Sequence, residues 1–247
     1  TWDKGSFGLE PKTPEMLPRE YAREAWKRGM AYEAELGANP FKFGLVGGTD
    51  THTGLATADD DNFFGKFPDS EPSKNRLSSK MGGYLWENWK LAASGYTGIW
   101  ARRNTREDLF AALKRREVYA TTGPRIALRF FGGWRYEDAD AARPDYAEVG
   151  YAKGVPMGGD LTAADGDQVP RLLIVATKDP DGANLDRIQV IKGWRSRSGS
   201  LHERVYEAAL SDQRSVDSNT GKAPVVGSTV DLANATYTNQ IGDAVLS

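Results

Sequence analysis

An aspartate and a histidine two positions apart are the residues of this sequence best suited to bind a metal ion. Asp50 and His52 belong to the segment Gly-Thr-Asp-Thr-His-Thr-Gly at residues 48–54, directly after the apolar run that ends at Val46. In extended backbone, side chains at positions i and i+2 point to the same face, so both groups can reach one site. A carboxylate oxygen beside an imidazole nitrogen is typical of catalytic zinc, iron or manganese sites.

These two side chains do not complete a catalytic metal site by themselves. The sequence has 2 histidines and no cysteine, so His202 carries the other imidazole and there is no thiolate ligand. His202 follows Ser198-Gly199-Ser200 and has no partner at a spacing typical of metal ligands. We therefore expect His202 to lie on the surface. The residues alone leave a second interpretation open, in which Asp50 caps a turn beside a surface histidine.

The elements before the pair are predicted to be a helix and a strand. Pro18 suits the first turn of a helix that runs to about Leu36, and Gly37 suits its C-terminal cap. After the breaker Asn39-Pro40, the residues from Phe41 to Val46 are expected to form the strand that delivers the pair.

A second strand is predicted from Tyr96 to Ala101, followed by a helix that Asn104 caps, with Glu107 in the capping-box position. A third short strand is expected at residues 117–120. Strands that alternate with helices indicate a parallel α/β arrangement, in which sites lie at the carboxyl ends of strands. Arg103 lies at such an end, as do Asp50 and His52.

The second half of the chain is predicted to be a β domain without helices. Short β-like runs separated by turns cover residues 126–131, 171–177, 187–191 and 204–209. The sequence Asp-Pro-Asp-Gly at residues 179–182 is typical of a hairpin turn. We therefore expect an α/β domain at residues 1–124 and a mostly-β, sandwich-like domain at residues 125–247.

Charge and hydropathy exclude two classes of partner. The 32 Lys and Arg residues nearly balance the 34 acidic residues, for a net charge of −2, which gives no basis for binding nucleic acid. No apolar stretch reaches transmembrane length. The sequence starts at Thr1 without a Met and stops within a strand-like run at Ser247, which predicts a portion of a longer polypeptide.

Several separate blocks, in the same order, resemble a known family. Residues 48–52 resemble the last metal-binding motif of the PHP (polymerase and histidinol phosphatase) superfamily of metal-dependent hydrolases. Residues 39–55, 61–66 and 104–126 resemble a PHP-like bacterial family known as domain of unknown function 3604. Such families also tend to carry an acid just before the Asn-Thr-Arg-Glu block, where this sequence has Arg102-Arg103.

The resemblance implies a distorted (β/α)7 barrel with a bi- or trinuclear centre of zinc, manganese or iron. Only Asp50 and His52 fall on the family's metal ligands, and the other ligands belong upstream of this sequence. The chain is then expected to be the last segments of such a barrel followed by the β domain. Its partner would be the missing N-terminal portion of the same protein.

The implied chemistry is metal-assisted hydrolysis of a small-molecule ester or phosphoester. Arg103, Arg125 and Asn62 are the candidates for contacting the substrate, although a structural salt bridge is the alternative for Arg125. The rival function is a non-catalytic module whose β domain recognises a saccharide or a protein. Relatives often carry export signals, so the expected location is periplasmic or secreted, and otherwise cytoplasmic.

Overall fold

The computed structural model describes residues 13–16, 19–54, 66–67, 73–75, 78–80, 95–162, 167–231, 233–234 and 236–247. The chain divides into two compact units. The first comprises Thr1–Phe43 and Gln189–Ala208, and the second comprises Gly44–Ile188 and Ala209–Ser247. The division into domains at residues 124 and 125 stays a prediction.

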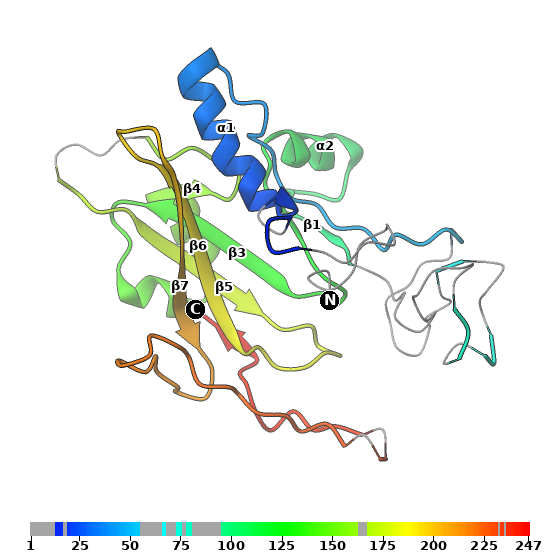
Figure 1. Cartoon of the computed structure of the whole chain (residues 1–247). Helices are drawn as coiled ribbons and strands as arrows, with labels where there is room; N and C mark the ends of the chain where they lie inside the picture. Colours follow the sequence, from blue (N-terminus) through cyan, green and yellow to red (C-terminus); the bar gives the residue numbers. More distant parts are fainter. Residues whose placement is uncertain are drawn as a thin grey trace. The chain divides into compact units, whose positions relative to one another are not determined.

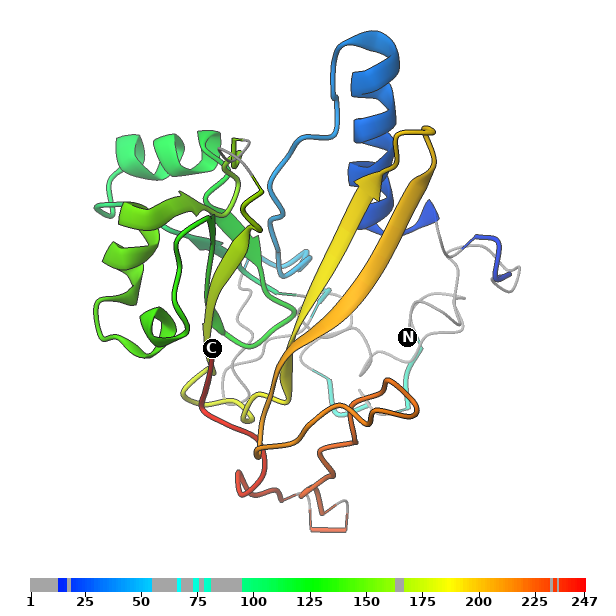
Figure 2. The ribbon, with the colours of Figure 1, turned by 90° about the vertical axis from the view of Figure 1, so that its left-hand side faces the viewer.

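The first unit contains the long helix and most of one hairpin. Helix α1 (Ala22–Leu36) ends at Gly37, whose φ of 74° is left-handed and whose N–H donates to the Glu33 carbonyl. This confirms the C-terminal cap that the sequence predicts. The hairpin consists of β6 (Arg187–Arg195) and β7 (Leu201–Leu210), which form a two-stranded sheet (Figure 2).

Ion pairs connect this helix to the hairpin. The Nζ of Lys27 lies 3.2 Å from Oε2 of Glu203, and the Nε of Arg23 lies 3.3 Å from Oε1 of the same residue. Gly193 on β6 faces the Lys27 side chain, so one face of the hairpin contacts α1.

The second unit is built on a four-stranded sheet in the order β4-β3-β5-β8 (Figure 1). Its strands are β3 (Ala127–Gly133), β4 (Gly154–Pro156), β5 (Arg171–Thr177) and β8 (Val245–Leu246), and every neighbouring pair is antiparallel. The predicted runs at residues 126–131 and 171–177 are therefore confirmed as strands. Two apolar clusters cover this sheet, one around Phe131 and Leu173 and one around Ala176, Ile188 and Leu246.

The expectation that the second half has no helix is wrong. A 3-10 helix η4 (Asp138–Ala142) and the helix α3 (Tyr146–Lys153) lie between β3 and β4. With 8 residues, α3 is too short for a repeating apolar pattern to stand out. Its Gly150 lies against the Phe131 ring, where a Cβ would come within 2.6 Å of ring carbons.

The expected parallel arrangement is also wrong for the strands that flank α2 (Arg106–Lys114). Strands β1 (Thr97–Ile99) and β2 (Val118–Ala120) pair antiparallel. Arg116 adopts a left-handed φ of 62°, and the chain turns back there beside β1.

The N-cap of α2 is Thr105 rather than Asn104, because the Thr105 side chain accepts the Asp108 N–H at 3.3 Å. The sheets of the described residues contain 2, 4 and 2 strands, and none closes into a barrel, so the PHP-type barrel and the sandwich stay predictions. Within the described ranges, no helix combines the length and the apolar character that crossing a bilayer requires.

Candidate functional site

The segment that leads to Asp50 is irregular rather than a strand. Residues 42–51 form no ladder with a neighbouring strand, so the strand predicted from Phe41 to Val46 is wrong. The Gly47 carbonyl instead accepts a hydrogen bond from Oγ1 of Thr97 at 2.6 Å. A Cβ at Gly47 would lie 2.4 Å from the Tyr96 carbonyl oxygen, so only glycine permits this approach to β1.

Lys66 and Phe67 hold the Asp50–His52 loop. The carboxylate of Asp50 pairs with the ammonium group of Lys66, and the His52 N–H donates to the Lys66 carbonyl at 2.8 Å. The His52 ring stacks on Phe67 with 4.6 Å between ring centroids and 19° between planes. Asp50 itself has a left-handed φ of 52°, a conformation that aspartate tolerates better than most residues.

The two expected ligands lie together at the surface. His52 Nε2 is 4.0 Å from Asp50 Oδ1, and the two side chains are 53% and 59% exposed. Ligands about 2.0–2.1 Å from one tetrahedral ion lie about 3.3 Å apart, so small side-chain rotations bring both onto one ion. The hydrogen bond from Lys66, reinforced by the charges of Lys66 and His52, lowers the pKa of Asp50, which favours the carboxylate form.

The pair supplies two donors, whereas a catalytic zinc site uses three protein ligands. In the part of the chain that the structure describes, no three His, Cys, Asp or Glu side chains gather as a metal site. Residues 59–61, whose acidic side chains the sequence places after the loop, lie outside the described residues. Asp50 and His52 therefore suit one portion of a metal centre.

The three predicted substrate contacts have different surroundings. The Nε of Arg103 donates to Oδ2 of Asp108 at 2.8 Å, and the Arg103 side chain is 76% exposed. Asn62 lies outside the described residues. Arg125 lines a cavity of about 970 Å³ in the second unit, and neither Asp50 nor His52 lines that cavity.

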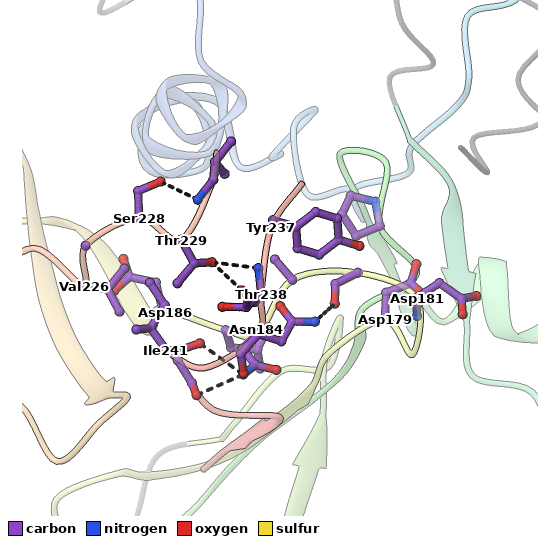
Figure 3. A pocket seen from close by; sticks show the side chains of 18 of the residues that line it. Asp179, Asp181, Asn184, Asp186, Val226, Ser228, Thr229, Tyr237, Thr238 and Ile241 are labelled. Carbon is purple, nitrogen blue, oxygen red and sulfur yellow. Dashed lines mark hydrogen bonds between the residues drawn. The ribbon is translucent and has the colours of Figure 1, made fainter. Parts of the chain in front are cut away.

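Three loops and a short turn form this cavity, which we call the loop cavity (Figure 3). Its walls come from residues 123–125, 179–186, 226–230 and 237–242. The turn at residues 179–182 joins β5 to β6, which lie in different sheets, so the predicted hairpin turn is wrong.

Asp179 fixes the loop that carries Arg125. Its carboxylate accepts the Arg125 N–H at 2.5 Å and the Asp181 N–H at 3.1 Å. These bonds, led by the one from Arg125, lower the pKa of the largely buried Asp179. The Arg125 guanidinium donates to Asp181 at 2.8 Å, as the salt-bridge alternative predicts.

The sequence does not single out the other wall residues. The amide nitrogen of Asn184 lies 3.0 Å from the carbonyls of Asn239 and Ile241 and 3.2 Å from that of Gly242. Asn239 in turn donates to the Gly182 carbonyl at 3.2 Å. Arg125 and the turn sequence at residues 179–182 were the parts of this region that the sequence marked in advance.

Comparison with known proteins identifies a family that matches the chain. Residues 1–247 match the family described as protein of unknown function (DUF3604). No curated protein and no solved structure matches the chain.

Proposed function

The chain belongs to the DUF3604 family, and we propose that it is the carboxy-terminal portion of a PHP-like, metal-dependent hydrolase that acts on phosphoesters. The observation that supports this proposal is the convergence of Asp50 and His52. A carboxylate and an imidazole lie 4.0 Å apart, and both are open to solvent on one loop.

The surroundings of the pair suit cation binding. Asp50 already holds one cation, the ammonium group of Lys66, in the arrangement that a divalent ion would replace. The stack on Phe67 limits rotation of the His52 ring, and a ligand restricted in advance loses less entropy on binding. The depressed pKa of Asp50 favours the carboxylate form that a metal requires.

A bound zinc, manganese or iron ion would lower the pKa of a coordinated water and stabilise charge on the attacked ester. The chain's own residues would then perform two tasks. Asp50 would hold one ion, and His52 would hold that ion or a neighbouring one. The remaining ligands would come from an N-terminal portion of the same protein, and the substrate would be a small-molecule ester or phosphoester.

Metal analysis of the natural polypeptide that contains these residues tests the proposal. The double variant Asp50→Asn with His52→Ala is compared with the matched double variant Asp138→Asn with His202→Ala. The latter replaces a fully exposed aspartate and an exposed histidine that belong to other segments of the chain. We expect the first variant to lose at least one equivalent of divalent metal per chain, measured by mass spectrometry of the elements.

Activity on bis(p-nitrophenyl) phosphate gives the second measurement. We expect the activity of the first double variant to fall about 100-fold or more. Replacing a residue that only hydrogen-bonds to a metal ligand already costs about 10- to 100-fold in activity or metal affinity. Wild-type protein without divalent metal, or equal metal content in both double variants, would overturn the proposal.

A further inference from the structure

We propose that the loop cavity, which is separate from the Asp50–His52 loop, binds a small neutral saccharide. Its volume of about 970 Å³ lies at the upper end of the range of about 300–1,000 Å³ that is usual for ligand sites. All of its walls belong to the second unit, so the site needs no contribution from the first.

The cavity is formed before any ligand arrives. Asn184 ties residues 239–242 to the turn after β5, and Asp179 ties the Arg125 loop to the same turn. The Thr229 hydroxyl contacts the Thr238 main chain across the opposite wall. Walls that are already held in place reduce the entropy cost of binding.

Polar atoms with unused hydrogen-bonding capacity line this preformed space. Within the described residues, the hydroxyls of Tyr237 and Thr238 have no hydrogen-bond partner, and Asp181 uses only one of its carboxylate oxygens. Tyr237 is 55% exposed, and the Asp181 side chain is 82% exposed. Figure 3 shows all three side chains around the cavity.

These groups suit the chemistry of a sugar. The paired planar groups of Arg125 and Asp181 present donors and acceptors side by side, as two adjacent sugar hydroxyls do. A tyrosine offers a flat apolar ring together with a polar hydroxyl, so Tyr237 can contact both the C–H face and the hydroxyl edge of a pyranose. Val226, Val230 and Ile241 supply apolar wall between the polar groups.

The charge of the walls selects a neutral ligand. Three aspartates line the cavity, and each is paired with an arginine: Asp179 and Asp181 with Arg125, and Asp186 with Arg187 and Arg214. A charged ligand would therefore have to compete with these ion pairs for an opposite charge, whereas a neutral ligand leaves them intact. A metal ion is disfavoured because, among the described residues, the three aspartates of the walls do not come together as a set of metal ligands.

Saturation-transfer NMR and calorimetry on the polypeptide that carries this chain test the proposal. The probes are maltotriose, cellotriose and chitotriose, with glucose 6-phosphate and spermidine as charged comparisons. We expect at least one neutral trisaccharide to bind with a dissociation constant below about 1 mM, and both charged probes to bind more weakly.

Two variants locate the binding. Tyr237→Ala removes the ring and Thr238→Val removes a hydroxyl at constant shape, and each is expected to weaken binding about tenfold. Tyr206→Ala, on the exposed hairpin strand β7, is the matched control and should leave binding unchanged. Three outcomes would overturn the proposal. They are no binding of any neutral probe, tighter binding of a charged probe than of every neutral probe, or binding by Tyr237→Ala that equals that of the wild type. The metal content measured for the Asp50–His52 proposal is unaffected by any of them.

Discussion

Lys66 holds both predicted metal ligands, Asp50 with its side chain and His52 with its main chain. Its ammonium group pairs with the Asp50 carboxylate, and its carbonyl accepts the His52 N–H at 2.8 Å. The side chain thus competes with a metal ion for Asp50, while the main chain keeps the loop in shape. The two contributions are separable, because a substitution of Lys66 removes the side-chain ammonium group and leaves the main-chain carbonyl in place.

Replacing Lys66 by methionine is expected to tighten zinc binding. The change removes a competing cation from an exposed carboxylate, an interaction worth about 1 kcal/mol, so the dissociation constant should fall about fivefold. The pKa of Asp50 should rise toward its ordinary value, because the hydrogen bond from Lys66 is the main cause of its depression. A chelator competition assay measures the affinity, and carboxyl NMR measures the pKa.

Lys114→Met, at the exposed end of α2, is the matched control for this substitution. Weaker zinc binding by Lys66→Met than by the control would contradict the competition and would make Lys66 a positioning residue for Asp50.

Glu117 is a buried carboxylate whose loss is expected to destabilise the second unit. It is 3% exposed, it accepts a hydrogen bond from the Tyr151 hydroxyl, and Arg115 lies 3.2 Å away. Arg129, stacked 3.4 Å above the Trp100 ring, approaches the same carboxylate. Removing this buried carboxylate leaves its hydrogen-bonding and ion-pair partners unpaired, so Glu117→Ala should lower the free energy of unfolding by about 3 kcal/mol.

Tyr151→Phe keeps the Glu117 carboxylate but removes the hydroxyl that donates to Glu117 and accepts from Arg129, and it should cost about 1–2 kcal/mol. Urea unfolding followed by fluorescence measures both effects, with the exposed Asp167→Ala as the control. If Glu117→Ala costs no more than Asp167→Ala, the cluster does not stabilise the fold.

Asp179 is expected to make stability depend on acid pH. Its pKa is lowered in the folded state, first by the Arg125 N–H, so its contribution is complete above the unfolded pKa of about 3.9. The contribution is lost as the pH falls below that value and through the folded pKa. The urea midpoint of unfolding should therefore be higher for the wild type than for Asp179→Asn at neutral pH, and this difference should shrink at about pH 3.

Asp138→Asn is the control for this pH series, because the Asp138 side chain is fully exposed. A difference between wild type and Asp179→Asn that stays constant from neutral pH to about pH 3 would mean that the carboxylate's charge contributes nothing.

Local signals in the sequence predicted the elements whose causes are local. The cap at Gly37 follows from a residue that accepts a left-handed conformation, and β5 follows from its own apolar run. The strand expected from Phe41 to Val46 failed because Gly44 and Gly47 allow close contacts with β1 and β2 without a ladder.

Distant contacts account for what the sequence did not predict. Asn184 builds the loop cavity through carbonyls that lie 55, 57 and 58 residues away, and no spacing pattern carries that information. The Asp50–His52 pair was predictable because its two members are neighbours in the chain. Lys66, which holds the pair, is 16 residues from Asp50 and was not singled out.

Two cationic side chains lie opposite each other on the hairpin of β6 and β7. Reversing the charge of one of them is expected to stabilise the hairpin. The main-chain bond between Ser196 and Ser200, the Gln189–Glu207 hydrogen bond and the Trp194–His202 stack all give the same register. That register places Lys192 opposite Arg204. Among the described residues, both side chains lie over aromatic rings and neither has an ion-pair partner. Like charges directly opposite in an antiparallel pair are destabilising.

The substitution Lys192→Glu converts this repulsion into attraction and should raise the free energy of unfolding by about 0.5–1 kcal/mol. Arg197→Glu makes the same charge change in the exposed turn of the hairpin and serves as the control. Salt separates the two causes, because screening weakens the repulsion in wild type and the attraction in the variant. The advantage of Lys192→Glu should therefore shrink at about 1 M NaCl in urea unfolding. An advantage that persists at high salt, or one that Arg197→Glu shares, would show that the gain does not come from the Lys192–Arg204 pair.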